Sequence, residues 1–199
     1  MSHYFTNSPE LGSKPRIISY SFNSVNFSLK SDIGVFSKNN LDEGSEAFIK
    51  VLLSQKLYGR ILDVGCGIGP IGLTLATFNP HLEFMLIDVN ARACTLAREN
   101  ANSLKLKNVQ VKESNIYENV EGNFDFIVTN PPIRAGKKVI YKMFEEAKGL
   151  LNINGSLFIV IRKDQGAQSA QRFIASVFGN CQLLKRDRGY YIYQAIKCD

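Results

Sequence analysis

The stretch that decides the fold is Arg60-Ile61-Leu62-Asp63-Val64, followed at once by Gly65-Cys66-Gly67-Ile68-Gly69-Pro70. The first five residues form a short apolar segment that is typical of a buried strand. Glycines at alternate positions then let the backbone approach a ligand closely, where any Cβ atom would collide. The start of a following helix offers unpaired N–H groups. This stretch therefore predicts a strand, a ligand-binding turn and a helix in succession.

Strands and helices continue to alternate toward the C-terminus. We expect further strands at 83–88, 109–111, 124–129 and 156–161, and helices at 90–104, 138–151 and 167–178. The helix at 138–151 is expected to end at the turn Asn154-Gly155, and 181–187 with 190–197 resemble a closing antiparallel hairpin. This alternation predicts an α/β fold: a mainly parallel sheet with helices on both faces. In such sheets ligands bind beyond the carboxyl ends of the strands.

The N-terminal part of the chain reads differently. Apolar residues alternate over 15–31 in two runs separated by Asn23-Ser24, which predicts a β-hairpin. A helix is expected from Ser45 to Lys56. The length of 199 residues suits a single domain. We therefore expect a single domain over 1–199, with 1–40 as a hairpin extension and 41–199 as the core.

Composition narrows the possible functions. The net charge of +6 hints at an anionic partner. The four cysteines contain no C-x-x-C pair and the two histidines are isolated, so we expect no disulfide framework and no metal site. No apolar run approaches the length of a membrane span. We expect a cytoplasmic protein without a membrane partner, and the oligomeric state stays open.

The glycine turn lies between two carboxylates that suit a cationic nucleoside. Asp63 precedes it, and Asp88 closes the second strand, where its carboxylate can accept hydrogen bonds from ribose hydroxyls. Dinucleotides prefer the spacing G-x-G-x-x-G, whereas this chain has G-x-G-x-G, and Pro70 stands where the third dinucleotide glycine would be. Asp63 would also repel a pyrophosphate. S-adenosylmethionine, which carries an ammonium, a sulfonium and no phosphate, is therefore the expected cofactor. The alternative is a turn that serves chain geometry alone.

The fourth strand of this series ends in Asn130-Pro131-Pro132-Ile133. Two prolines stiffen the backbone and remove two donors, which leaves the side-chain oxygen of Asn130 and the carbonyl of Pro131 as acceptors. Together they can take both hydrogens of a planar –NH₂ group and aim its lone pair at a methyl donor. The alternative is a proline-stiffened turn. Asn115, just past the third strand, either binds the adenine amino group or caps a helix.

These motifs together resemble those of class I methyltransferases that modify amino nitrogens. Gly34-Val35-Phe36-Ser37 and the later Leu41-Asp42-x-Gly44-Ser45 resemble the RsmC-type small methyltransferase domain family. The resemblance implies a Rossmann-like seven-stranded sheet whose last strand is antiparallel, and methylation of the guanine N2 amine in small-subunit (16S) ribosomal RNA. It implies catalytic roles for Asn130, Pro131, Pro132 and Ile133. The expected cofactor contacts are Asp63, Gly65, Cys66, Gly67, Gly69, Asp88, Val89, Asn115, Asn130 and Phe36.

Two departures from the family bear on the substrate. The better-known enzymes carry an additional N-terminal domain, and many amino methyltransferases have an aromatic residue where this chain has Ile133. Candidate contacts with ribosomal RNA are Ser37, Arg134, Lys137, Arg162 and Lys163, with Lys185, Arg186 and Arg188 farther along. Two other functions stay open: methylation of a protein amide or small amine, and a ribosome-assembly factor that binds S-adenosylmethionine without turnover. The glycine spacing disfavours a nicotinamide dehydrogenase.

Overall fold

The computed structural model describes residues 12–35 and 40–199. The strands are β1 (Arg16–Phe22), β2 (Val25–Ser31), β3 (Arg60–Val64), β4 (Glu83–Asp88), β5 (Val109–Glu113), β6 (Phe124–Thr129), β7 (Leu151–Arg162), β8 (Gln182–Asp187) and β9 (Tyr190–Ile196). The helices are α1 (Glu43–Leu53), α2 (Pro70–Phe78), α3 (Ala91–Ser103), α4 (Lys137–Leu150) and α5 (Ala167–Phe178), with short 3-10 turns η1 (Ile133–Ala135) and η2 (Lys163–Gln165).

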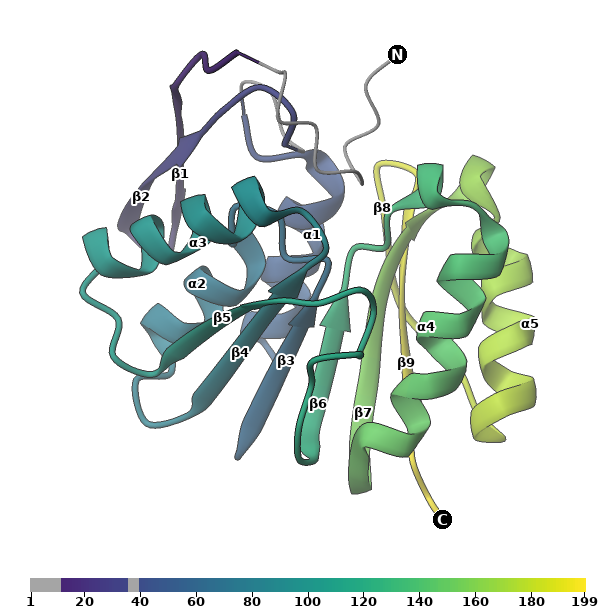
Figure 1. Ribbon diagram of the computed structural model, residues 1–199. Coiled ribbons are helices and arrows are strands. Elements are labelled where there is room, and N and C mark those ends of the chain that lie inside the picture. Colours follow the sequence, from purple (N-terminus) through teal and green to yellow (C-terminus); the bar gives the residue numbers. More distant parts are fainter. Residues whose placement is uncertain (1–11, 36–39) are drawn as a thin grey trace.

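A seven-stranded sheet in the order β5-β4-β3-β6-β7-β9-β8 forms the centre of the molecule (Figure 1). Strands β5 to β7 of that order are parallel, and β9 runs antiparallel to both of its neighbours. The expected Rossmann-like sheet with an antiparallel last strand is therefore confirmed. Within the described ranges, no helix is long and apolar enough to cross a membrane.

Helices cover both faces of the sheet because its central parallel strands are apolar on both sides. Ile61 packs with α1, α2 and α3, whereas its neighbour Leu62 packs with α4 and α5. Both side chains are fully buried. Adjacent residues of a strand point to opposite faces, so a continuous apolar run is what a sheet buried on both sides requires.

The hairpin β1–β2 extends the first of these two cores. Its turn residues Asn23 and Ser24 both have positive φ, at 45° and 66°, which confirms the expected two-residue turn. Phe27 and Leu29 are fully buried in the cluster that holds α1, α2 and α3. The side chain of Asn100 in α3 accepts from Lys30 N and donates to Lys30 O, which fastens β2 to the helix.

Several boundaries differ from the sequence expectation, and two of these differences have a clear cause. Helix α1 begins at Glu43 rather than Ser45, because the side chain of Asp42 caps it. The turn expected at Asn154-Gly155 lies inside β7, which begins at Leu151 and shifts register against β6. Gly155 is needed there for close backbone packing, since an added Cβ atom would lie 2.9 Å from the carbonyl of Asp125.

Candidate active site at the carboxyl edge of the sheet

The glycine turn, Asp88 and the motif Asn130-Pro131-Pro132-Ile133 lie at one edge of the sheet. Strand β3 is central, and it pairs in parallel with β4 on one side and with β6 on the other. Val64, the last residue of β3, lies opposite Ile87 of β4 and Thr129 of β6. The glycine turn, Asp88 and Asn130 follow these strand ends directly, so the topology brings them together as the sequence predicted.

The glycine turn is held against the end of β4 by backbone hydrogen bonds. Gly65 N and Cys66 N both donate to the carbonyl of Ile87 at 2.9 Å. Gly67 N donates to Asp88 Oδ2 at 2.8 Å. Gly67 has φ of +57°, and an added Cβ atom there would meet nothing within 4 Å. The turn therefore leaves open space beside its backbone, which is the cradle that a ligand needs.

Asp63 provides a buried negative group beneath this turn. Its side chain is 1% exposed, and Oδ2 accepts from Gly72 N at 2.9 Å. No described residue bonds to Oδ1, which is buried as well. The pKa of Asp63 is raised to about 7. Burial raises it most, the hydrogen bond from Gly72 N lowers it, and the charge of Asp88 raises it. A cationic ligand end would favour the ionised form and offset this desolvation.

Asp88 lies at the rim of the cradle. Oδ2 accepts from Gly67 N, and Oδ1 accepts from Asn90 N at 2.9 Å. Burial raises its pKa, and hydrogen bonds from the backbone of Asn90, Gly67 and Val89 oppose the shift. A carboxylate has about four lone-pair positions, so these three bonds leave about one free to accept from a hydroxyl. Asp63 and Asp88 thus fit a ligand that carries a cation and a ribose.

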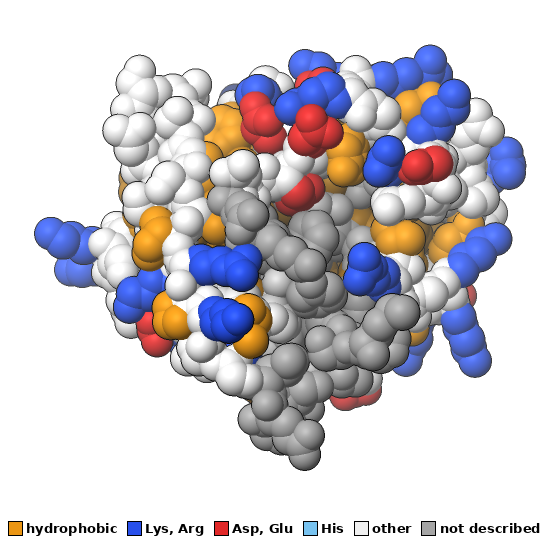
Figure 2. Space-filling model, turned by 90° about the horizontal axis from the view of Figure 1, so that it is seen from above, with side chains coloured by type: hydrophobic (Ala, Val, Ile, Leu, Met, Phe, Trp, Pro, Cys, Tyr) orange, Lys and Arg blue, Asp and Glu red, His pale blue; other side chains and the backbone are white. Residues whose placement is uncertain are grey.

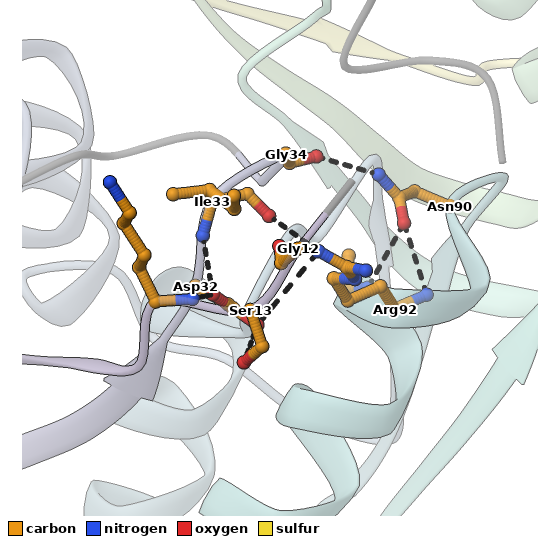
Figure 3. A network of polar contacts seen from close by, with 9 residues as sticks. Gly12, Ser13, Asp32, Ile33, Gly34, Asn90 and Arg92 are labelled. Carbon is orange, nitrogen blue, oxygen red and sulfur yellow. Dashed lines mark hydrogen bonds and ion pairs between the residues drawn. The ribbon is translucent and has the colours of Figure 1, made fainter. Parts of the chain in front are cut away.

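A polar network anchors the N-terminal segment beside Asp88 (Figure 3). Asn90 caps α3 through Oδ1 and donates from Nδ2 to the carbonyl of Gly34 at 3.0 Å. Arg92 donates to the carbonyl of Ile33 at 3.1 Å and lies 3.9 Å from Asp32. The sequence placed Asn90 only at the start of the helix expected at 90–104. Phe36 and Ser37, which follow this anchored stretch, lie outside the described residues.

The motif Asn130-Pro131-Pro132-Ile133 lies beside the glycine turn. Thr129 Oγ1 donates to the carbonyl of Val64 at 2.7 Å, which ties the end of β6 to the end of β3. An added Cβ atom on Gly65 would lie 3.8 Å from Cδ of Pro132. Pro131 is buried, and Pro132 is half-buried. A ligand in the cradle would therefore lie close to Asn130.

Asn130 has a defined amide orientation. Its Nδ2 donates to Ser45 Oγ at 3.1 Å and to Asp42 Oδ1 at 3.4 Å, both at the start of α1. These contacts leave Oδ1 at the opposite end of the planar amide, and no described residue donates to it. The oxygen is therefore available to accept from an –NH₂ group. Sequence reasoning quoted Asp42 and Ser45 only as part of a resemblance.

The remaining candidates lie around this edge. Asn115 is exposed and donates to Glu118 Oε1 at 2.8 Å in a turn that forms no helix, so it is not a helix cap. Ile133 begins η1 and packs against the α4–α5 core. Cys66 is buried, and burial raises the pKa of its thiol. Gly69 is the N-cap residue of α2, and an added Cβ atom there would collide with Leu73.

Basic side chains lie around the margin of this edge, as the view from above shows (Figure 2). The exposed ones that follow β6 and β7 are Arg134, Lys137, Lys138, Arg162 and Lys163. Arg188, in the β8–β9 turn, instead forms ion pairs with Glu43, Glu46 and Asp187. Its guanidinium fastens the turn to α1. In the first group, Arg162 pairs with the exposed Asp164 at 3.3 Å.

Comparisons with known proteins agree on one family. Residues 26–194 match the methyltransferase small domain. A Bacillus subtilis protein, YbxB, described as uncharacterized, is 41% identical over 98% of both chains. The ribosomal RNA small subunit methyltransferase C of Aliivibrio fischeri is 34% identical over 88% of this chain and 51% of its own length.

One solved structure shares nearly the whole fold. It is the T. thermophilus 16S rRNA N2 methyltransferase (RsmC) in complex with AdoMet and guanosine, with a TM-score of 0.84 and 25% identity. The match covers 95% of this chain and 52% of that one. The chain thus spans nearly all of YbxB and about half the length of the RsmC proteins that it matches.

Proposed function

The chain belongs to the methyltransferase small domain family, and from that premise we propose that it methylates the exocyclic N2 amine of a guanine in small-subunit ribosomal RNA. S-adenosylmethionine is the methyl donor. Bound in the cradle, the donor supplies a sulfonium methyl group, whose carbon–sulfur bond breaks as the amine nitrogen bonds to carbon and an amine proton passes to solvent. The residues of the chain have to bind and orient the two partners.

The donor side of the site holds a cation and a ribose. We assign Asp63 to the positively charged methionine end, because its buried Oδ1 lacks a partner among the described residues. Asp88 accepts from a ribose hydroxyl at the rim, where its two oxygens are held by backbone N–H groups. The open space beside Gly67 admits the ligand against the backbone.

The acceptor side rests on one observation, the orientation of the Asn130 amide. Its Nδ2 is engaged by Asp42 and Ser45, so Oδ1 is the atom left to bind an amine. With the Pro131 carbonyl as the second acceptor, both hydrogens of the amine are held and its lone pair points toward the donor. This arrangement needs positioning rather than a strong base, because the alkylated nitrogen loses its proton readily.

The choice of ribosomal RNA rests on the margin of the site and on the relatives. Arg134, Lys137, Arg162 and Lys163 are exposed at the same edge as Asn130 and can contact phosphates while one base enters the pocket. The A. fischeri relative is a ribosomal RNA methyltransferase. The T. thermophilus structure contains guanosine beside AdoMet.

The test is transfer of labelled methyl groups from S-adenosylmethionine to 30S subunits from cells that lack this protein, followed by nucleoside analysis. Label in N2-methylguanosine is the expected result. Asn130→Ala should reduce transfer by at least about 100-fold while leaving the Kd for S-adenosylmethionine unchanged. Cofactor binding without label in RNA would refute the ribosomal substrate, and full activity in Asn130→Ala would refute the amine clamp.

A further inference from the structure

Residues at the start of α1 contact the side chain of Asn130. Asp42 Oδ1 accepts from Ser45 N at 3.0 Å, which caps the helix, and the same oxygen accepts from Asn130 Nδ2 at 3.4 Å. Ser45 Oγ accepts from Asn130 Nδ2 at 3.1 Å. Ser45 is buried, and Asn130 is half-buried. A side chain at the end of β6 is thus held by two acceptors that lie more than 80 residues earlier.

We propose that Asp42 is a positioning residue that selects the reactive orientation of the Asn130 amide. An asparagine amide can rotate by half a turn and exchange its oxygen for its nitrogen. In one orientation Oδ1 faces the incoming amine and accepts its hydrogens. In the other orientation Nδ2 would face the amine, and donors would oppose donors. The consequence for catalysis rests on the proposed function, whereas the orientation itself does not.

Asp42 can make this selection, and Ser45 cannot make it alone. An ionised carboxylate only accepts hydrogen bonds, so a rotated amide would place the oxygen of Asn130 against the oxygen of Asp42 with no proton between them. A serine hydroxyl can turn and donate instead, and it therefore tolerates either orientation. Ser45 adds a contact, and Asp42 decides the direction.

Capping alone does not account for an aspartate at this position. Serine and asparagine cap helices about as well as aspartate does. The second oxygen of Asp42, Oδ2, is shielded from solvent and has no hydrogen-bond partner among the described residues. A buried unpaired oxygen costs free energy, which a serine at the cap would avoid. An acceptor that cannot also donate is what serine and asparagine lack.

The turn that carries Asp42 is itself held from outside by the β8–β9 hairpin. The ring of Tyr190 lies so close to the backbone of α1 that an added Cβ atom on Gly44 would be 2.6 Å from Cε1. Arg188 in the same hairpin pairs with Glu43 and Glu46 of α1. Asp42 therefore acts from a supported position, which a positioning residue requires.

The decisive variant is Asp42→Ser, which keeps a good helix cap and removes the carboxylate. Its matched control is Glu43→Gln, which removes the next carboxylate of the same turn without a contact to Asn130 and leaves the 3.0 Å ion pair of Arg188 with Glu46 in place. The first readout is the side-chain NH₂ signal of Asn130 in ¹⁵N-labelled protein without substrate, identified by its loss in Asn130→Ala. We expect Asp42→Ser to shift this signal and to speed its hydrogen exchange about tenfold, since a freed amide exchanges more readily.

The second readout is methyl transfer to 30S subunits. Asp42→Ser should lower kcat by about 100-fold and leave the Kd for S-adenosylmethionine unchanged, whereas Glu43→Gln should retain wild-type kcat. Because Asp42 acts through Asn130, adding Asp42→Ser to Asn130→Ala should cause no further loss. Asp42→Asn keeps the helix cap and the shape of the side chain, so its kcat should lie between those of Asp42→Ser and the wild type.

Unchanged Asn130 signals in Asp42→Ser, or equal effects of Glu43→Gln, would overturn the inference. If Asp42→Ser fails to fold by circular dichroism, the same comparison is made with Asp42→Asn. There, an Asn130 signal and kcat identical to wild type would overturn it. Absence of transfer by the wild-type protein would refute the proposed function instead, and the NMR comparison would still decide the role of Asp42.

Discussion

Lowering the pH should weaken cofactor binding through Asp63. The side chain is 1% exposed, and burial raises its pKa to about 7. Without ligand, Asp63 is therefore protonated in about half of the molecules at pH 7 and in about nine-tenths at pH 6. A neutral carboxyl group does not attract the positive end of S-adenosylmethionine, so binding has to remove that proton.

The size of the effect follows from the pKa. If only the ionised form binds, the apparent Kd rises about tenfold from pH 8 to pH 6 and about ninefold more from pH 6 to pH 5. Stability of the ligand-free protein has the same origin. The folded pKa lies above the ordinary value of 3.8. The stability that Asp63 contributes is therefore complete below about pH 4 and is lost as the pH rises through about 7.

Isothermal titration calorimetry at pH 8, 7, 6 and 5 measures the Kd for S-adenosylmethionine and the number of protons released on binding. In two buffers of different ionisation enthalpy at pH 6, about 0.9 proton should be released per S-adenosylmethionine bound. Asp63→Asn can still accept from Gly72 N but cannot ionise, so it should flatten the pH dependence to what Asp88 contributes. A Kd that stays constant from pH 8 to pH 5, or an Asp63→Asn variant with the wild-type slope, would refute the reasoning.

Three further changes separate the parts of the site. Asp88→Ala should raise the Kd for S-adenosylmethionine at least about tenfold through loss of the ribose acceptor, and a smaller rise in calorimetry would contradict that assignment. Gly72→Ala should lower the free energy of unfolding by about 1–3 kcal/mol, because its Cβ atom would lie 2.8 Å from the Leu86 side chain; urea denaturation measures this. Asn100→Ala should cost about 3 kcal/mol in the same assay, because the fully buried amide donates to the carbonyls of Lys30 and Ile68. An unaffected midpoint would show that water replaces those bonds.

The sheet was predictable because its signals are local. Where a strand runs into alternating glycines, as from Ile61 to Gly69, the glycines mark the end of the strand in the sequence. The chemical types at strand ends were also readable, and the structure brings Asp63, Asp88 and Asn130 to the same edge. Parallel strands necessarily collect their carboxyl ends at one edge. Hence a sequence with recognisable strand ends predicts which side chains will be neighbours.

The orientation of the side chains was not predictable, because it depends on contacts between distant segments. Nothing in the sequence near Asn130 shows that Asp42 and Ser45 will hold its amide, or that Asn90 will bind Gly34 as well as cap α3. The turn expected at Asn154-Gly155 was wrong for the same reason. Gly155 is required there because the backbone of Asp125 in the neighbouring strand approaches it closely.

Under the proposed function, the pairing of β3 with β6 places the donor side of the site next to the acceptor side. Neighbouring strands of a sheet are about 4.8 Å apart. The glycine turn, which we propose holds the donor, follows β3, and Asn130 follows β6, so the register Val64↔Thr129 sets these two parts of the site side by side before any ligand binds. The Thr129 hydroxyl fastens that register at the last residue pair. Orientation is then the remaining variable, and the contacts of Asn130 with Asp42 and Ser45 are what restrict it.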